Sequence, residues 1–199
     1  MRRAQPGTAG RDRLASGCAA QRRRVSLTVE TAPEAGRTVA GHMSTPPDTS
    51  TLKLIALDGD DLKVLSAHLQ DAVLKVADMA FVPRERRFAA IMNRFDWSKT
   101  LATGKPDNAT RRQAALRFER VLGAKVSGID LKAGHEVLNL LAVQFEPTAT
   151  EDPQGHVTLV FAGGGAVRLH VECIEAELKD LGPAWQARAV PRHPDDEPA

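Results

Sequence analysis

The stretch 156–172, HVTLVFAGGGAVRLHVE, constrains the fold more than any other part of the chain. Apolar residues occupy every second position on both sides of three consecutive glycines, a spacing typical of half-buried β-strands. Phosphate-binding glycine loops lead from a strand into a helix, whereas here a second strand follows the glycines. We therefore expect Gly163, Gly164 and Gly165 to form the turn of a β-hairpin, where glycine adopts positive φ at little cost.

Alternating apolar positions recur along the chain and predict about seven strands. Besides the two arms of the hairpin, they occur in residues 51–57, 73–82, 87–97, 114–129 and 136–145. Short polar connections such as PRER at 83–86 suit tight turns between neighbouring strands. Strands joined in this way predict a mostly antiparallel sheet.

Helical spacing of apolar residues predicts one helix near each end of this region. Three leucines in 62–69 follow the acidic stretch 58–61, a composition that favours a helix start. Apolar residues in 174–181 have helical spacing before a glycine and a proline, which predicts a closing C-terminal helix. The expected class is α+β, a bent antiparallel sheet or partial barrel with two helices. Its plan is similar to that of a pleckstrin-homology domain, and a flatter two-layer sandwich is the alternative.

Charge divides the chain into segments. Residues 1–42 hold eight arginines and three acidic residues and so carry +5, whereas residues 43–199 carry −3. A transit peptide and a basic arm for nucleic acid are alternative interpretations of this start. We expect instead that Met43 is the natural first residue and that residues 1–50 form a disordered basic extension. A single folded domain is expected over 51–186, followed by a disordered tail over 187–199.

Bulk composition narrows the class of protein. The chain is 42% hydrophobic and 26% charged, and it has no apolar run long enough to span a membrane. Aromatic residues make up only 4%, which disfavours stacking on single-stranded nucleic acid. Cys18 lies in an arginine-rich stretch and Cys173 in an apolar one, a poor pair for a disulfide. These features predict a protein of the cytoplasm.

Three long blocks of the sequence resemble a known family. They are LKLIALDGDDLKVLSAHLQDAVLKVADMAFVPRERRFAAIMNRFDW, LRFERV and VTLVFAGGGAVRLHVECIEAELKDLGPAW, within residues 51–186. With these blocks the chain is similar to an uncharacterised alphaproteobacterial family, domain of unknown function 2948. The resemblance implies no activity, cofactor or catalytic residue, and it supports Met43 as the natural start.

Residue types suited to catalysis occur without suitable spacing. Ser66, His68 and Asp71 lie on one predicted helix, where Ser66 and His68 point about 200° apart and cannot share a proton. The remaining histidines of the predicted domain and tail have no cysteine or carboxylate companions at ligand spacing. They are His135, His156, His170 and His193. We therefore expect no catalytic residue, no cofactor and no metal site.

The segment 81–97, FVPRERRFAAIMNRFDW, is the strongest candidate for a binding surface, because arginine and tryptophan are enriched in binding hot spots. The candidate residues are Arg84, Arg86 and Arg87 at the predicted hairpin tip and Asn93, Arg94, Asp96 and Trp97 at the end of the next strand. Arg111, Arg112, Arg117 and Arg120 would extend this surface. The structural alternative is a solvated strand whose arginines pair with Glu85 and Glu119.

These observations favour a small non-catalytic binding or adaptor module that recognises a protein partner or an anionic ligand. The alternative is a small enzyme whose pocket is assembled from separate strands. Binding of nucleic acid is the least favoured hypothesis, since residues 43–199 are net acidic. The sequence identifies neither the partner nor the oligomeric state.

Overall fold

The computed structural model describes residues 51–97, 109–150, 152–188 and 191. The predicted extension 1–50 and most of the predicted tail 187–199 lie outside the described residues. The one α-helix of the described part is α1 (Gly59–Leu69). The strands are β1 (Lys53–Ala56), β2 (Ala72–Lys75), β3 (Met79–Val82), β4 (Arg87–Phe95), β5 (Thr110–Phe118), β6 (Val121–Ser127), β7 (Val137–Pro147), β8 (Gly155–Phe161), β9 (Ala166–Val171), β10 (Ala176–Asp180) and β11 (Trp185–Gln186). Short 3-10 turns are η1 (Val76–Asp78), η2 (Pro83–Glu85) and η4 (Ala162–Gly164).

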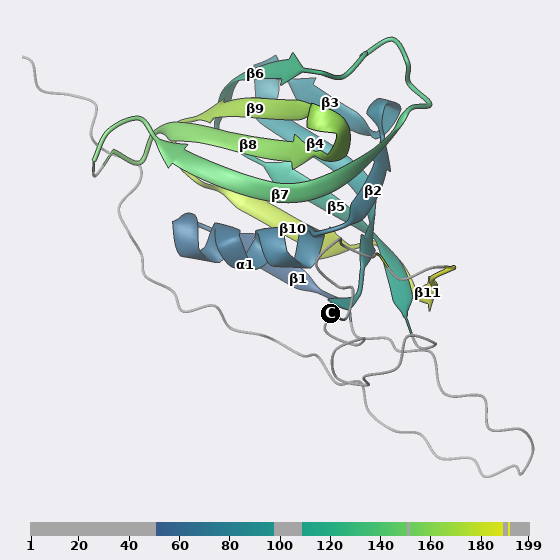
Figure 1. The fold of residues 1–199 in the computed structure, drawn as a ribbon. Coiled ribbons are helices and arrows are strands. Elements are labelled where there is room, and N and C mark those ends of the chain that lie inside the picture. Colours follow the sequence, from purple (N-terminus) through teal and green to yellow (C-terminus); the bar gives the residue numbers. More distant parts are fainter. Residues whose placement is uncertain (1–50, 98–108, 151, 189–190, 192–199) are drawn as a thin grey trace, which may run out of the picture.

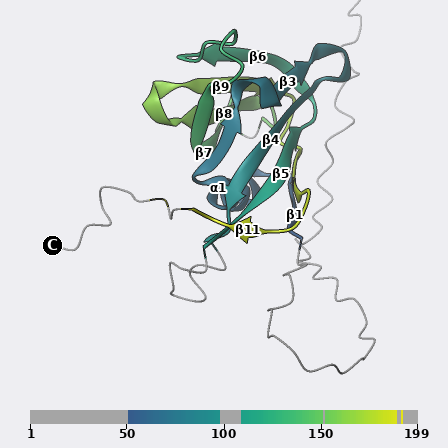
Figure 2. The ribbon, with the colours of Figure 1, turned by 90° about the vertical axis from the view of Figure 1, so that its right-hand side faces the viewer.

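The strands form one antiparallel sheet that bends over on itself. Its order is β1-β10-β5-β4-β2-β7-β8-β9-β6, with β3 also paired to β4 and β11 also paired to β5. Figure 1 shows β6 to β9 in front of β4, β5 and β10, with α1 below them. Figure 2 shows the same curvature from the side, with β4 and β5 next to each other. The hydrophobic core lies inside this bend, and α1 contributes Leu62, Leu65 and Leu69 to it.

The helix α1 confirms the early helix predicted from the sequence. Asp58 caps it, because its side chain accepts hydrogen bonds from the amides of Asp60 and Asp61 at 3.0 and 2.9 Å. On the same helix, the Ser66 hydroxyl accepts a hydrogen bond of 2.8 Å from the amide of Val143. That amide follows an irregularity in the pairing of β7 with β8, so Ser66 satisfies a backbone group that the sheet leaves open.

The predicted C-terminal helix is wrong, because residues 176–180 form the strand β10 between β1 and β5. Ala176, Leu178 and Asp180 point inward and are all buried, which is the period of a strand. The third inward position is an aspartate, so the hydrophobic alternation stops there. The spacing of Ile174 and Leu178 then imitates a helix.

The predicted long strand 114–129 is two strands. It breaks at Glu119 and Arg120, and Arg120 has a φ of 57°. Up to the break β5 pairs with β4 and β10, whereas after it β6 pairs with β9 on the other side of the bend. The chain therefore passes from one half of the sheet to the other at this corner.

These differences correct the expected class. The described residues form eleven strands rather than about seven, with one helix rather than two. The pleckstrin-homology-like plan is also wrong, because the sheet ends at β1 and at β6 and does not close. The helix α1 lies between β1 and β2 in the chain, as predicted, but it is the only α-helix of the described part.

The three glycines form the predicted hairpin turn between β8 and β9. Gly163 and Gly164 have φ of 80° and 84°, whereas Gly165 has a φ of −70° and is needed for a different reason. A Cβ at Gly165 would lie 2.9 Å from Cγ1 of Ile129. The turn and the loop after β6 approach each other too closely for a side chain at this position.

Candidate functional site

The sequence NRFDW at the end of β4 sends its side chains alternately to the two sides of the sheet. Arg94 points inward and is 4% exposed, and Asp96 lies next to another inward arginine, Arg112. Asn93 and Trp97 belong to the outer side, together with Phe95, which is fully covered there. This short segment therefore contributes side chains both to the interior and to the outer surface, because side chains alternate along a strand.

On the inner side, Arg94 and Asp180 form a buried ion pair between β4 and β10. The guanidinium donates from Nε to Oδ1 at 2.7 Å and from Nη2 to Oδ2 at 2.9 Å, the bidentate arrangement that fits a carboxylate best. The Asp180 side chain is completely buried, and its Oδ2 also accepts a hydrogen bond of 2.9 Å from the amide of Leu52. The pair thus joins β4 and β10 to the residue that precedes β1.

A second arginine lies beside this pair. Arg112 is 1% exposed, and it is the direct cross-strand partner of Arg94. Two like charges in that position repel each other unless acids lie between them. Asp180 and Asp96 supply these acids, at 3.9 and 3.7 Å from Nε of Arg112. We call Arg94, Asp96, Arg112 and Asp180 the buried cluster; its formal charges cancel.

His68 of α1 interacts electrostatically with charged residues of the buried cluster. Burial is the main cause that lowers the pKa of His68 below its usual value, and Arg94 adds to the decrease. Asp96 and Asp180 act in the opposite direction. His68 is therefore favoured in its neutral form beside the cluster.

On the outer side, Phe95 and Trp97 pack together with Arg111. The two rings are tilted with centroids 4.6 Å apart, and the Arg111 guanidinium lies 5.5 Å from the Phe95 centroid. Arg111 donates from Nη1 to the carbonyl oxygens of Asp71 and Asn93, both at 3.1 Å. Burial lowers the pKa of Arg111, while Asp71 opposes this shift.

Next to these residues, a row of outward side chains crosses four strands. Gln113 of β5 is opposite Asn93 of β4, Asn93 is opposite Val73 of β2, and Val73 is opposite Asn139 of β7. We call these four residues the amide row. Oδ1 of Asn139 is covered and accepts no hydrogen bond from any described residue. A covered acceptor of this kind reduces the stability of the fold.

Exposed apolar side chains border the amide row. Ile91 of β4, Leu181 after β10 and Trp185 of β11 are 44%, 47% and 43% exposed. The amide of Leu181 bonds to the carbonyl of Gln113, and Trp185 is the cross-strand partner of Arg111. The amide row, this apolar border and Arg111 are the candidate site.

The predicted arginines at the hairpin tip lie at the other end of β4. Arg87 and Phe95 are the two ends of this nine-residue strand, which is roughly 26 Å long. Arg87 bonds to Glu85 at 2.6 Å and to Glu119 at 2.9 Å, and Arg86 is paired with Glu172. Arg84 forms no ion pair with a described residue. The structure therefore does not bring the seven predicted residues together.

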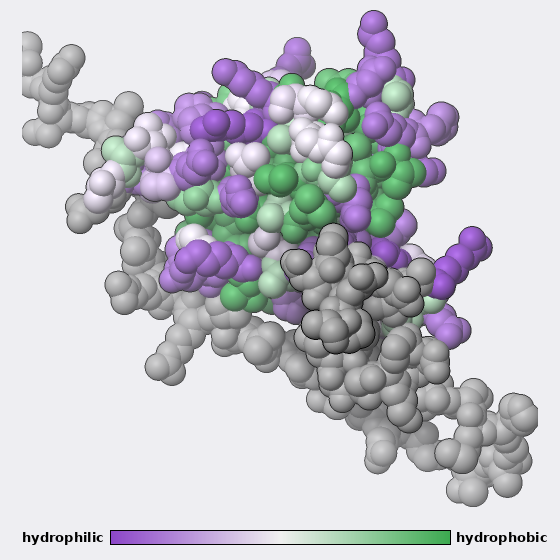
Figure 3. Space-filling model, viewed as in Figure 1, coloured by the Kyte–Doolittle hydropathy of each residue, from purple (hydrophilic) through white to green (hydrophobic). Residues whose placement is uncertain are grey.

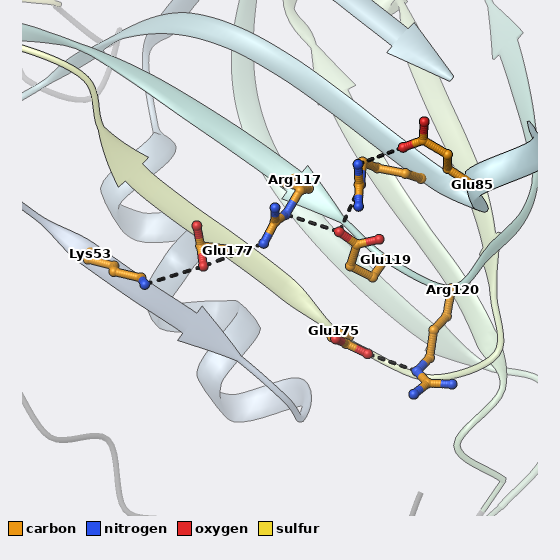
Figure 4. A network of polar contacts seen from close by, with 8 residues as sticks. Lys53, Glu85, Arg117, Glu119, Arg120, Glu175 and Glu177 are labelled. Atoms are coloured by element: carbon orange, nitrogen blue, oxygen red, sulfur yellow. Dashed lines mark hydrogen bonds and ion pairs between the residues drawn. The ribbon is translucent and has the colours of Figure 1, made fainter. Parts of the chain in front are cut away.

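Ion pairs continue from the tip across the outer face of β5, β10 and β1 (Figure 4). Arg117 lies 3.1 Å from Glu119 and 3.6 Å from Glu177, which in turn is 3.6 Å from Lys53. We call this set, with Glu85 and Arg87, the surface ladder. The outer face of β5 thus carries paired charges around Arg117, whereas Gln113, four residues away, is uncharged, and the exposed Lys179 of β10 lies between these two levels.

Sequence reasoning missed Asp180, Gln113 and Val73 as neighbours of NRFDW. Arg111 and Arg112 do lie beside that motif as proposed, but Arg112 points inward, and Arg117 and Arg120 belong to ion pairs elsewhere. The available signal for Asp180 was its position in AELKD, where it continues an alternation begun by Ala176 and Leu178.

No helix in the described part of the chain has both the length and the apolar character needed to cross a membrane. Neither a curated protein nor a solved structure matches the chain. A family model described as Protein of unknown function (DUF2948) matches residues 52–193. Because this match covers more than half of the chain, the protein belongs to the DUF2948 family.

Proposed function

We propose that the protein is a non-catalytic binding module that engages a protein partner through the amide row and its apolar border. The observation that carries the proposal is the separation of charge on the outer face. At the hairpin end the surface ladder pairs its charges, whereas the amide row contains three amides and a valine. Protein interfaces have few charged residues at their centre and are enriched in tryptophan and arginine.

The apolar border supports a protein partner rather than an anionic ligand. Ile91, Leu181 and Trp185 are each more than 40% exposed, so a partner would cover apolar surface as well as form hydrogen bonds. Arg111, two residues before Gln113 on β5, already bonds with its guanidinium to two carbonyls.

The buried cluster supports the proposal by fixing the strands beneath the row. Arg94 and Asp96 alternate with the outward residues Asn93 and Trp97, and Arg94 is held by two hydrogen bonds. The charged groups of the cluster converge from separate strands, as the enzyme alternative requires. They are enclosed and bound to one another, so we assign them the role of an anchor.

The cytoplasm is the proposed compartment. Cys173 is a buried thiol that forms no disulfide with a described residue. A buried thiol of this kind is consistent with a reducing environment.

Photo-crosslinking from one strand tests the proposed surface. A photoreactive residue is introduced in the full chain at Gln113, and separately at Arg117, four positions further along β5 on the same outer side. The native cell is irradiated, and crosslinked products are identified by mass spectrometry. We expect one stoichiometric protein adduct from position 113 and none from position 117. Adducts of equal yield from both positions, or none from position 113, would refute the proposal.

A substitution at Asn139 separates binding from stability. Replacement of Asn139 with valine removes the covered acceptor, so we expect the free energy of unfolding to rise by about 1 kcal/mol. The same variant should show a weaker crosslink from position 113. A variant that is more stable and crosslinks as well as the parent protein would remove Asn139 from the proposed surface.

A further inference from the structure

A row of potential metal ligands crosses the opposite side of the bent sheet, away from the amide row. His156 of β8 is the direct cross-strand partner of His170 of β9. Glu146 of β7 is opposite His156, and Gly123 of β6 is opposite His170. The two histidines are fourteen residues apart in the sequence, and the hairpin around the three glycines brings them together.

The two imidazoles lie face to face on the outer surface. Their centroids are 5.0 Å apart, and the ring planes are inclined by only 18°. In Figure 3 the left part of the front face, where β7 ends and β8 begins, is mainly hydrophilic. Both side chains are only partly covered, and the glycine beside His170 has no heavy atom within 4 Å of the place where a Cβ would be. Rotation about the side-chain bonds can therefore turn a nitrogen of each ring toward a common point.

An ion pair between β9 and β7 lies beside the two histidines. Arg168, two residues before His170 in β9, donates from its guanidinium to Glu146 at 3.1 Å. Glu146 thus offsets a charge that would otherwise repel a cation.

We propose that His156 and His170 together bind a divalent first-row transition metal ion, with zinc as the ion to be tested. Directly opposite residues on antiparallel strands have Cβ atoms about 5 Å apart, a separation that two imidazoles can bridge through one metal ion at about 2.0–2.1 Å from each nitrogen. Zinc, nickel and copper all favour imidazole ligands. Among the described residues no group of three or more histidine, cysteine or carboxylate side chains is arranged to hold a metal ion. The protein therefore supplies two ligands, and water fills the remaining positions.

The site is independent of the proposed protein-binding surface. The amide row lies on β2, β4, β5 and β7 near NRFDW, whereas the histidine pair lies on β8 and β9. We expect that loss of metal binding at the histidine pair leaves protein binding at the amide row intact, and the reverse. The two proposals can therefore fail separately.

Calorimetric titration of the full chain with zinc chloride tests the pair. The variants are His156→Gln, His170→Gln and the double variant, with His135→Gln as the control, because His135 is a single exposed histidine on the loop before β7. Two ligands of one ion act together, since the second bond forms within the same molecule. We expect each single variant to bind zinc about tenfold or more weakly than the parent protein, because one imidazole then holds the ion alone, and we expect the double variant to lose the remaining affinity at this pair.

The pattern among the variants decides the outcome. The control should keep the affinity of the parent protein, and circular dichroism should show that all variants keep the same fold. Half the number of bound zinc ions in each single variant, at unchanged affinity, would mean two separate weak sites, and equal affinity of the parent and the double variant would mean no site at this pair. Either result would overturn the proposal.

Discussion

The buried cluster and the surface ladder are built from the same chemical groups, yet they have different roles in the fold. Arg94 and Asp180 exclude water, form two parallel hydrogen bonds and are at most 4% exposed. Arg117 of the ladder is 43% exposed, and its contacts to Glu119 and Glu177 are 3.1 and 3.6 Å long. Water competes with the second set of contacts but not with the first.

Burial decides how strongly an ion pair affects the stability of the fold. A buried charge that loses its partner retains its full desolvation cost, whereas an exposed one regains water. The cluster therefore makes its members mutually dependent. The ladder keeps the outer face soluble and contributes little to stability through any single pair.

The largest expected effect follows from removal of one partner in the cluster. Asp180→Ala leaves Arg94 and Arg112 opposite each other with fewer acids between them. We expect the free energy of unfolding to fall by about 3–5 kcal/mol, measured by urea denaturation. A loss below about 1 kcal/mol would mean that this cluster behaves like the surface ladder.

Removal of both partners should cost less than removal of one. In the double variant Arg94→Met and Asp180→Leu, no unpaired charge of this pair remains, and Arg112 keeps Asp96 at 3.7 Å. We expect a stability within about 2 kcal/mol of the parent protein, higher than that of either single variant. Urea denaturation of all four proteins gives the coupling energy. If the stability losses of the two single variants simply added up in the double variant, Arg94 and Asp180 would not depend on each other.

The surface ladder should respond weakly to the loss of one member. Arg117→Gln removes two ion pairs, yet we expect a loss of less than about 1 kcal/mol, because the side chain is largely in water. The loss should shrink further when urea denaturation is repeated in high salt. A large loss of unfolding free energy that does not depend on salt would mean that Arg117 behaves like a residue of the buried cluster.

The smallest expected effect depends on pH. The pKa of His68 is lower in the folded protein than its ordinary value of 6.5, so the unfolded chain binds more protons between these two values. The contribution of His68 is therefore complete above pH 6.5 and is lost as the pH falls through the folded pKa. We expect the parent protein to lose more stability than His68→Gln between pH 7.5 and pH 5.5. Parallel urea curves for the two proteins would contradict this expectation.

The local elements were predictable because each depends on neighbouring residues. The acids before α1 and the glycines between β8 and β9 define their elements without any knowledge of the rest of the fold. β10 was not predictable in this way, because Asp180 occupies a buried position that Arg94 and Arg112, both on distant strands, and the amide of Leu52 make tolerable. Hydrophobic alternation cannot identify an inward residue that is charged.

The candidate site was predictable only in part, for a related reason. NRFDW could be identified as unusual from its composition, but its neighbours depend on the register between strands. Gln113, Val73 and Asn139 come from three other strands, and none of them has a distinctive sequence context. The pairing His156 with His170 likewise became visible only through the hairpin register.

The alternation within NRFDW limits how this segment can change during evolution. Substitutions at Asn93 can retune recognition while Arg94 continues to hold β10. A single-residue insertion or deletion between them would exchange the two sets, exposing the anchors and burying the contact groups. We expect natural variants of this segment to differ by replacement of residues, with its length preserved.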